Sequence, residues 1–310
     1  MFYICTKFKR LASCRAIFSK LIVGAIIVLT NSMLFGQRHE IGVRMGMSNL
    51  VGDIGRTNYV LQKPLGGNIS SVGLPFYGGI LYRMNFNPYQ TLRFDFGYSH
   101  IQFDDAAAKE TYRRNRGYSG TNDMAHLDVV FEYNFFPVNE EQRSMVSPYI
   151  FGGLGAMLPS VMRLTSNNNF RVVGGEYVAP TQDQDFITET ELTTGRKLVM
   201  SIPFGAGLKY KFNYNWAISG EFMFRPTFTD GIDYSQIDDK DVKIVYSKDI
   251  LMPNSNKSYL NQSPYKEVAA ERANEIVESR KIGNVNSKDW VNTVSVSLTY
   301  SFGRPPCYCE

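Results

Sequence analysis

The chain has 310 residues, a formal charge of +4 at pH 7, 14% aromatic residues and 26 glycines. Its mean hydropathy of −0.22 excludes a bundle of membrane-spanning helices, which would be strongly apolar. It does not exclude a membrane β-barrel, because half of the strand positions in such a barrel are polar. The length allows one large domain or two small ones.

Residues 1–36 are predicted to be a secretory signal peptide. Five basic residues precede an apolar run at 21–29, which is too short to span a bilayer. Neither Cys5 nor Cys14 follows that run, so the segment is not a lipoprotein signal, and cleavage is expected near Gly36. The leader holds five of the 33 Lys and Arg residues and none of the 29 Asp and Glu residues, which leaves the mature chain with 28 basic residues and a net charge of −1. This balance gives no indication of nucleic-acid binding.

In the mature chain, eight stretches alternate apolar and polar residues with a period of two, which indicates strands with one face toward an apolar medium. In chain order they are 40–47, 75–84, 92–99, 126–135, 149–157, 200–212, 216–225 and 290–302. Tyr77 and Leu81 make the phase of the second stretch ambiguous, and glycines blur the facing of the fifth.

The last stretch has the clearest alternation. From 293 to 302 one parity is apolar and ends in Tyr300 and Phe302, whereas the other holds only Thr and Ser. This pattern is typical of the closing strand of an outer-membrane barrel, and an even number of strands is the rule in such barrels. A closing strand beside the first strand would remove the open edges of the sheet. We therefore predict an all-β fold, an eight-stranded antiparallel transmembrane β-barrel over residues 37–302.

The connections between these stretches alternate in length. Those at 85–90, 137–147 and 213–215 are short, and those at 49–74, 102–123, 159–197 and 226–289 are long. Outer-membrane barrels have short periplasmic turns and long extracellular loops, so both termini are expected in the periplasm. The aromatic residues predicted to form a girdle at that side are Tyr133, Phe135, Tyr149, Tyr210, Phe212, Trp216, Tyr300 and Phe302.

The last long connection is predicted to contain a short helix. Ser263 suits the N-cap, Pro264 the first helical position, and Gly283 can end the helix. Its apolar stripe consists of Tyr265, Val268, Ala269, Ile276 and Val277. We expect the stripe to pack against neighbouring loops, and a groove for a partner is the alternative.

The interior of an eight-stranded barrel is about wide enough for side chains to fill it. The charged residues predicted to face inward are Arg44, Arg93, Asp95, Asp128, Glu132, Lys209, Lys211, Glu221 and Arg225. We expect a network of paired charges, because an unpaired charge there would be costly. A conducting pore or a ligand channel is the alternative.

Catalysis has little support in the sequence, and we expect neither an enzyme nor a cofactor or metal. The mature chain has only three histidines, His39, His100 and His126. His126 shares a predicted inward face with Asp128, a pair that is more often lumen filling than part of a catalytic triad. Motifs of serine hydrolases, zinc proteases and nucleotide-binding loops are absent from the sequence. The acidic run at 238–241 lacks the spacing and the glycine of a calcium loop.

Residues 303–310 are predicted to form a periplasmic tail. Its two prolines prevent further strand pairing, and eight extended residues reach roughly 26–29 Å. Cys307 and Cys309, with Tyr308 and Arg304, are the candidate partner-binding or disulfide residues. The two thiols are poorly placed to bond each other without strain. They could be free, form a strained local bridge, bind a metal together with ligands from a partner, or bond a partner's cysteine. An inert tail is a further alternative.

Four segments together resemble the PorG family of Bacteroidetes type IX secretion systems. They lie at 39–59, 132–137, 225–234 and 283–290, and the most specific is GDIGRTNY at 52–59. The resemblance spans essentially the whole mature chain. It implies an outer-membrane barrel that associates with a periplasmic ring made of the lipoprotein PorK and its partner PorN. Outer-membrane lipids, and other barrels of the secretion system, are the further partners that it implies.

These patterns lead us to expect a non-enzymatic outer-membrane barrel that anchors or positions the PorK/PorN ring. The alternative is a stand-alone barrel that acts as an adhesin or ligand-binding protein through its long surface loops. An enzymatic barrel that depends on His100 or His126 is a third hypothesis.

Overall fold

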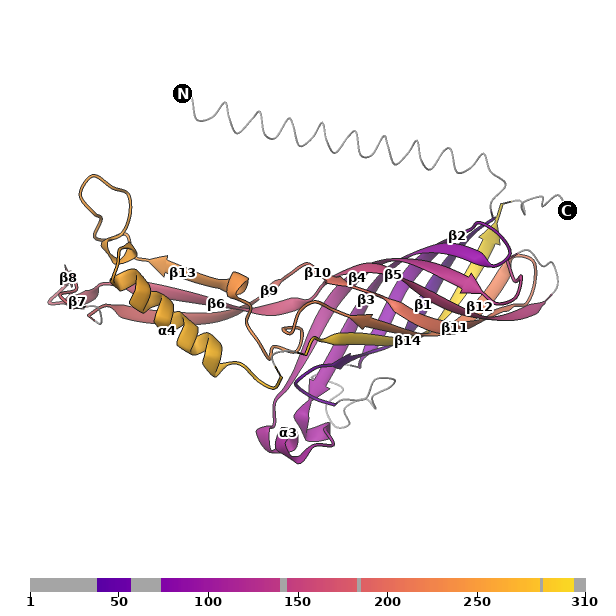
Figure 1. Cartoon of the computed structure of the whole chain (residues 1–310), viewed down its shortest axis with the longest axis horizontal. Helices are drawn as coiled ribbons and strands as arrows, with labels where there is room; N and C mark the ends of the chain where they lie inside the picture. The colour runs from indigo at the N-terminus through magenta and orange to yellow at the C-terminus, as the bar shows by residue number, and fades with distance from the viewer. Residues whose placement is uncertain (1–37, 57–73, 140–143, 183–184, 285–286, 304–310) are drawn as a thin grey trace, which may run out of the picture.

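The computed structural model describes residues 38–56, 74–139, 144–182, 185–284 and 287–303. Eight antiparallel strands form a closed ring in the order β5-β11-β12-β14-β1-β2-β3-β4, which the pairing of β4 with β5 completes (Figure 1). Their bounds are β1 (Arg38–Val51), β2 (Phe76–Asn85), β3 (Gln90–Asp104), β4 (Ser119–Asn134), β5 (Met145–Leu158), β11 (Phe204–Lys211), β12 (Trp216–Pro226) and β14 (Trp290–Phe302). The pairing of β1 with β14, which sets Val43 opposite Leu298, is the predicted contact between the first and last strands.

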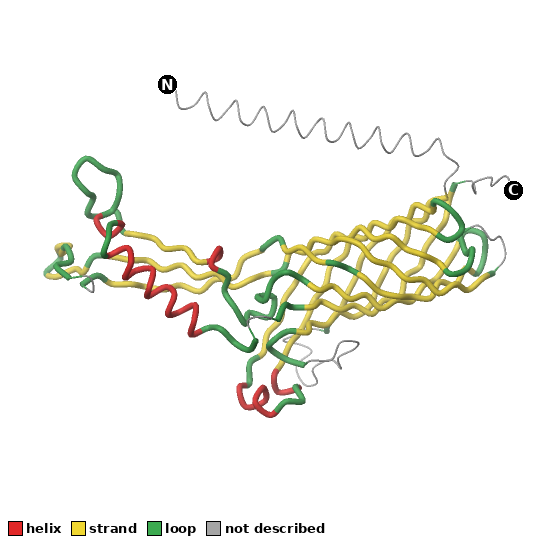
Figure 2. The backbone as a smooth tube through the Cα atoms, viewed as in Figure 1, coloured by secondary structure: helices red, strands yellow, loops and turns green. Residues whose placement is uncertain are grey.

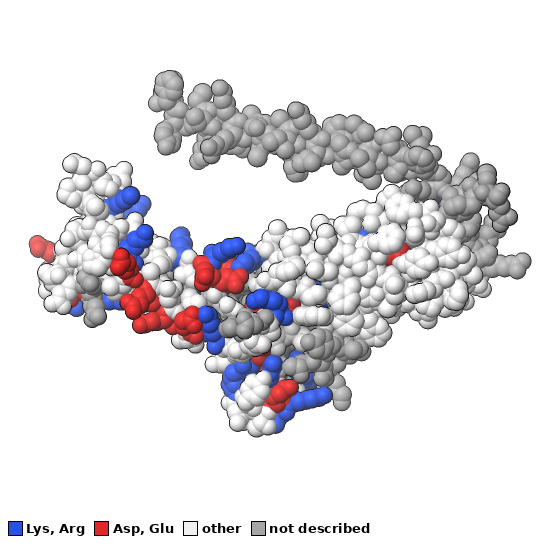
Figure 3. Space-filling view, in the orientation of Figure 1, with Lys and Arg blue, Asp and Glu red and all other residues white. Residues whose placement is uncertain are grey.

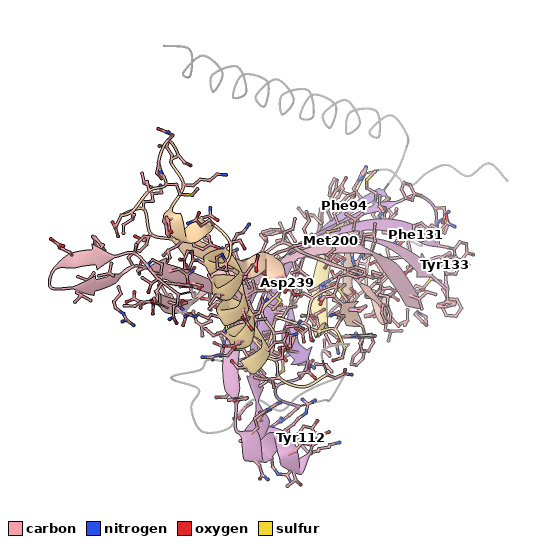
Figure 4. The ribbon with its side chains drawn as sticks, turned by 60° about the vertical axis from the view of Figure 1, so that its left-hand side comes forward. Phe94, Tyr112, Phe131, Tyr133, Met200 and Asp239 are labelled. Carbon is pink, nitrogen blue, oxygen red and sulfur yellow. The ribbon has the colours of Figure 1, made fainter. Side chains whose placement is uncertain are left out.

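The strands turn their apolar side chains outward and their polar side chains inward. Met45 is 68% exposed and Leu154 66%, whereas the serines and threonines of β14 are buried. Figure 3 shows a barrel wall almost without charge, and in Figure 4 Phe94, Phe131 and Tyr133 project from it. This arrangement is the reverse of a soluble barrel with an apolar interior, and it confirms the predicted alternation.

Tyr149 does not belong to the predicted outer girdle. Its side chain is 1% exposed and points into the lumen, where it packs with Phe151, Val130 and Met223. The neighbouring strand has Gly207 opposite it, and a Cβ there would lie 2.5 Å from the ring carbon Cζ of Tyr149. The missing side chain makes room for an aromatic ring inside the barrel. The other predicted girdle residues are exposed at the end of the barrel that carries the termini.

The predicted sixth strand, 200–212, is divided in two. β10 (Val199–Ser201) pairs with β5, and β11 begins only at Phe204. Pro203 lies between them and has no N–H to give to a ladder. Its carbonyl still accepts a hydrogen bond from the backbone N–H of Gly153 at 2.9 Å, so the wall of the barrel continues past the break.

The short connections lie at the same end of the barrel as residues 38 and 303, and the long connections lie at the other end (Figure 2). At the long-loop end, β3 and β4 extend beyond their neighbours and are joined by η1 (Asp105–Ala107) and α3 (Thr111–Arg116). Tyr112 of α3 lies near the tip of this lobe in Figure 4. The predicted leader, 1–36, and the tail beyond Gly303 are outside the described residues.

Two of the long connections are not loops but form one projecting structure, which we call the arm. Its sheet has the order β13-β6-β9 and consists of β6 (Ser160–Asn169), β9 (Ile187–Arg196) and β13 (Val242–Tyr246). A small hairpin of β7 (Arg171–Val173) and β8 (Glu176–Val178) forms the tip, and η2 (Asp239–Asp241) and η3 (Tyr259–Asn261) flank β13. The helix α4 (Tyr265–Ser279) lies along this sheet (Figure 1).

The predicted helix exists, but its predicted ends are wrong. Pro264 is the N-cap, and Ser263 instead donates its hydroxyl to Glu267 Oε1 at 2.7 Å. The C-cap is Arg280, so Gly283 lies beyond the helix. Tyr265 and Val277 are buried against the arm, as predicted for packing within the loops. No helix in the described parts of the chain is long and apolar enough to cross a membrane.

Candidate functional site

The middle of the lumen is filled by ion pairs. Arg93 contacts three carboxylates: Asp95 Oδ2 lies 2.8 Å from its Nε, Glu221 Oε2 lies 2.8 Å from its Nη1, and Glu132 also pairs with Nη1. The remaining pairs are Arg44–Asp95, Arg44–Glu221, Arg83–Glu40, Arg83–Glu132, Lys209–Glu40 and Arg225–Asp128, at 2.7–3.4 Å. Five cations thus face five carboxylates in this network, all of them buried. The expected network of neutralised charges is present.

Two members of this network, Arg83 and Glu40, are absent from the charged residues predicted to face inward. Arg83 is fully buried and joins Glu40 to Glu132. The ambiguous phase of the second strand hid Arg83, because Tyr77 and Leu81 are apolar and yet also face inward. Lys211 is buried, as predicted, but lies nearer the termini, 5.6 Å from the centre of the Tyr214 ring.

Other layers close the lumen on both sides of the ion pairs. Toward the termini, Arg38 Nη1 donates to the carbonyl oxygen of Asn139 at 3.0 Å, and Lys209 Nζ donates to Asn139 Oδ1 at 3.2 Å. The turn after β4 therefore folds into the barrel. Toward the long loops, an apolar layer crosses the lumen and consists of Leu50, Ile54, Ile101, Phe103, Met124, Met157, Ile232 and Val291. A lumen filled in this way favours a closed interior of paired charges over a conducting pore.

His126 and Asp128 do not combine into a catalytic triad. His126 Nε2 lies 2.7 Å from Ser99 Oγ, but Asp128 is turned to Arg225, whose Nη2 lies 2.9 Å from Asp128 Oδ2. His126 Nδ1 has no hydrogen-bond partner in the described part of the chain, so no carboxylate there orients the ring. His100 Nδ1 contacts Asp123 at 2.6 Å, and His39 Nδ1 contacts the Tyr82 hydroxyl at 2.8 Å.

Three segments far apart in the sequence form one hydrogen-bonded structure at the long-loop end, which we call the cap (residues 52–56, 227–235 and 289). Asp233 Oδ2 accepts from the backbone N–H groups of Asp53 at 2.7 Å and Ile54 at 2.9 Å. Asp289 Oδ2 accepts from Ile232 N at 2.8 Å. Asp289 also exchanges two backbone hydrogen bonds with residues 227 and 229, at 3.0 Å each. Three of the four segments that resemble the PorG family therefore meet here.

The cap concentrates buried carboxyl groups. Burial removes water from the Asp230 carboxyl group, and the negative charges of Asp53 and Asp233 repel its ionised form. Together these effects raise the pKa of Asp230 to about 7. Desolvation, with Asp233 as the nearest like charge, raises the pKa of Asp289 well above its usual value. The pKa of Asp53 is also raised by its burial. Among the described residues, no group of three or more His, Cys, Asp or Glu side chains has the geometry to hold a metal ion.

A cationic pair of side chains fixes the cap to the neighbouring lobe. Arg113 Nη1 donates to the carbonyl oxygens of Gly52 at 3.1 Å and Gly55 at 3.0 Å. Arg116 Nη2 donates to the carbonyl oxygen of Asp53 at 2.7 Å, and its Nε donates to Asp105 Oδ2 at 2.7 Å. The ion pair and backbone N–H groups at Asp105 hold its pKa below the usual value despite burial.

The acidic run at 238–241 lies at the junction of arm and barrel. Lys197 Nζ pairs with Asp238 Oδ2 at 2.5 Å and with Asp241, and these carboxylates raise the pKa of Lys197. A depression of about 720 Å³ beside this pair is lined by residues that include Met200, Phe228 and Asp239. Met200 and Asp239 are labelled in Figure 4. Two of the three acidic residues of the run, Asp238 and Asp241, thus pair with Lys197.

The predicted tail residues Arg304, Cys307, Tyr308 and Cys309 lie outside the described residues, so their role stays a prediction. The described part of the chain ends at Gly303, directly after Phe302 of β14, at the short-turn end of the barrel.

The sequence matches a family model described as "Domain of unknown function (DUF6089)" over residues 19–261 and 268–310. The chain belongs to this family. The match covers the barrel strands, the cap and the arm, apart from the first residues of α4. No curated protein matches the sequence.

Several solved structures are weakly similar to this DUF6089 chain. The N-terminal β-barrel domain of Pseudomonas aeruginosa OprF has 9% identity, covers 86% of this chain and 98% of its own, and has a TM-score of 0.33. Ail, the attachment invasion locus protein of Yersinia pestis, has 11% identity, coverage of 86% and 99%, and a TM-score of 0.34. Neisserial surface protein A has 11% identity, coverage of 86% and 97%, and a TM-score of 0.35. The barrel itself rests on the strand pairing described above.

Proposed function

We propose that this chain is a non-enzymatic outer-membrane β-barrel that anchors or positions the PorK/PorN ring of a type IX secretion system. The exposed apolar wall supports the membrane location, because a lipid-facing barrel presents apolar side chains outside and polar ones inside. With short turns on the periplasmic side, both termini lie in the periplasm and the arm lies outside the cell.

The observation that carries the link to secretion is the cap. Asp53 precedes Asp233 by 180 residues and precedes Asp289 by more, yet these three residues join three of the segments that resemble the PorG family. A chance resemblance of short segments would not be expected to select the parts of the chain that bond to one another. The fourth segment, 132–137, lies at the short-turn end, where Phe135 and Phe136 are exposed. That end would face the ring.

The filled lumen supports an anchoring role over transport. Ion pairs, a hydroxyl and histidine layer and an apolar layer occupy the interior from end to end. A folded cargo protein would have to displace all of these side chains, and each broken ion pair would leave a buried charge uncompensated. The barrel would therefore hold other components in place rather than conduct cargo.

The test is affinity purification of the full chain from detergent-solubilised outer membranes of its native bacterium. PorK and PorN should co-purify, and deletion of the gene should stop type IX secretion. A variant that lacks residues 304–310 is the matched test of the tail, since it leaves β14 intact. Normal secretion in the deletion strain, with neither ring protein recovered, would contradict the proposal.

The stand-alone adhesin is the competing function, and the projecting arm is the observation that favours it. Removal of 226–289 would not separate the two functions, because it would also remove Asp233 and Asp289 from the cap. Removal of 160–196 together with 242–281 leaves the cap in place. Lys197 N donates to the carbonyl oxygen of Pro159 at 3.0 Å, so the first cut can be rejoined there. An adhesin would lose binding with secretion intact, whereas a ring anchor would still recover PorK.

A further inference from the structure

The arm leaves one long strand edge unpaired. In the order β13-β6-β9, β9 hydrogen-bonds to β6 on one side, and no other strand among the described residues pairs with its second side. β9 runs for 10 residues in unbroken register with β6, and most of its side chains are exposed. Its sequence, ITETELTTGR, holds neither proline nor lysine.

The other edge of the same sheet differs. β13 has only 5 residues and carries Lys243, and α4 packs beside it through Ile244. Short length, lysine and cover by a helix are common ways in which proteins protect an edge strand from further pairing. β9 has none of these protections, so the asymmetry marks its edge as available for a partner strand.

A hydrogen bond made by β6 shows which residues of β9 point their backbone N–H and C=O groups to the free side. Ser247 N donates to the carbonyl oxygen of Asn168, so Asn168 turns its backbone groups toward β13. Thr188 lies opposite Asn168 and turns its own backbone groups the other way, to the free side. Thr190, Leu192 and Thr194 follow at every second position, so their backbone groups also point to the free side. These residues present an evenly spaced row of N–H and C=O groups for a further strand.

The two faces of β9 differ in chemistry. One face carries Glu189 and Glu191, which take part in no ion pair among the described residues. The other face carries Leu192, 36% exposed, on the side where Arg272 of α4 donates to Thr188 Oγ1 at 2.8 Å. A strand added beside β9 would therefore place alternate residues opposite two carboxylates and opposite an apolar side chain.

We propose that the free edge of β9 binds an extended segment of a partner protein as a fourth strand of the arm. Backbone hydrogen bonds would supply affinity, and alternate side chains would supply specificity. The segment would alternate lysine or arginine, opposite Glu189 and Glu191, with apolar residues opposite Leu192. This interface is distinct from the proposed ring contact, because the arm and the termini lie at opposite ends of the barrel (Figure 1).

The same charges argue against a second copy of this chain as the partner. Antiparallel pairing of two β9 strands about Thr190 would set Glu189 opposite Glu191, and pairing about Glu191 would set that residue opposite its own copy. Like charges directly opposite each other in a sheet are destabilising. A basic partner removes that repulsion and gains two opposite-charge pairs.

The test uses the full chain in neutral detergent micelles and a fluorescent peptide of the length of β9 in which valine alternates with lysine. Its controls are a valine–glutamate peptide and a shuffled valine–lysine peptide. Thr190→Pro removes an outward N–H without removing a bond to β6, and Thr190→Val keeps that N–H. Fluorescence anisotropy measures the affinity of the peptide, and hydrogen exchange measures how strongly the backbone amides of β9 are protected when it is bound.

The alternating valine–lysine peptide should bind, and binding should slow exchange at residues 190 and 192. Thr190→Pro should weaken binding about tenfold or more, as expected for the loss of one hydrogen bond, whereas Thr190→Val should leave it unchanged. Glu189→Gln with Glu191→Gln should weaken binding without touching the backbone. No binding at about 1 mM, equal binding of the shuffled peptide, or unchanged affinity in both Thr190→Pro and the glutamine variant would overturn the proposal.

Discussion

The carboxylate of Asp233 lies 2.7 Å from the backbone nitrogen of Asp53, across a separation of 180 residues in the sequence. The same oxygen lies 2.9 Å from the nitrogen of Ile54. One side chain from the last long connection thus fixes the backbone that leaves β1, and it can do so only in a barrel that brings these connections to the same end. The cap is therefore a product of ring closure.

We expect Asp233→Ala to loosen the cap while the barrel stays folded. The substitution leaves two buried N–H groups without an acceptor, at a cost of about 3 kcal/mol. Hydrogen exchange at the Asp53 and Ile54 amides should become about 100-fold faster. Asp239→Ala is the matched control, because Asp239 is exposed. Equal protection in the two variants would show that the cap does not depend on this carboxylate.

Gly52 should tolerate no side chain. A Cβ at this position would lie 2.5 Å from Asp289 Oδ1 and 2.6 Å from Asp233 Oδ2. Gly52→Ala should therefore separate the two carboxylates and loosen the same amides as Asp233→Ala. Gly78→Ala is its control, since nothing lies within 4 Å of a Cβ there. If both glycine variants behave like the wild type, the close packing at Gly52 is not limiting.

The cap should also weaken as the pH rises. The pKa of Asp230 is about 7 in the folded chain, whereas the ordinary value for an aspartate, as in the unfolded chain, is 3.8. A raised pKa means that the folded cap binds the proton more tightly, so this stabilisation is complete below the unfolded value and is lost as the pH rises through 7. Exchange at Ile232, corrected for its intrinsic pH dependence, should accelerate between pH 5 and pH 8. Asp230→Asn should flatten that profile, and an unchanged slope in this variant would exclude Asp230 as its source.

The barrel could be predicted from local sequence, because the period of two in β1 and β14 is set by which residues face outward from the barrel and which face the lumen. The inward position of Tyr149 could not, since it depends on the space left by Gly207 on the next strand. The arm was also missed. β6 and β9 lack a clear apolar alternation, and β13 joins β6 from about 80 residues further along the chain. For the cap, the resemblance to the PorG family singled out three of its segments in the sequence. Only the closed ring of strands brings those segments together.

The tail cysteines, which lie outside the described residues, carry a separate prediction. β14 ends at the short-turn end of the barrel, and exposed thiols in an oxidising periplasm tend to pair. We expect a disulfide from Cys307 or Cys309 to the ring lipoprotein. Non-reducing gels of outer membranes should show a band of higher mass that contains PorK and disappears with reductant. The same band in the Cys307→Ser/Cys309→Ser variant would prove this assignment wrong.

The lumen should behave as a set of mutually dependent charges. Arg225 Nη2 lies 2.9 Å from Asp128 Oδ2, and both side chains are fully buried. Arg225→Met leaves the carboxylate unpaired and should destabilise the barrel by about 3–5 kcal/mol, whereas adding Asp128→Leu should restore most of that loss.

Urea unfolding in detergent, followed by the change in gel mobility of the folded barrel, measures both variants. Asp128→Leu alone completes the cycle, because it leaves the Arg225 guanidinium without its carboxylate. Each single variant should be less stable than the double variant. If the double variant instead loses the sum of the two single losses, the pair contributes no coupling, and the lumen charges are held in place by the barrel wall rather than by one another.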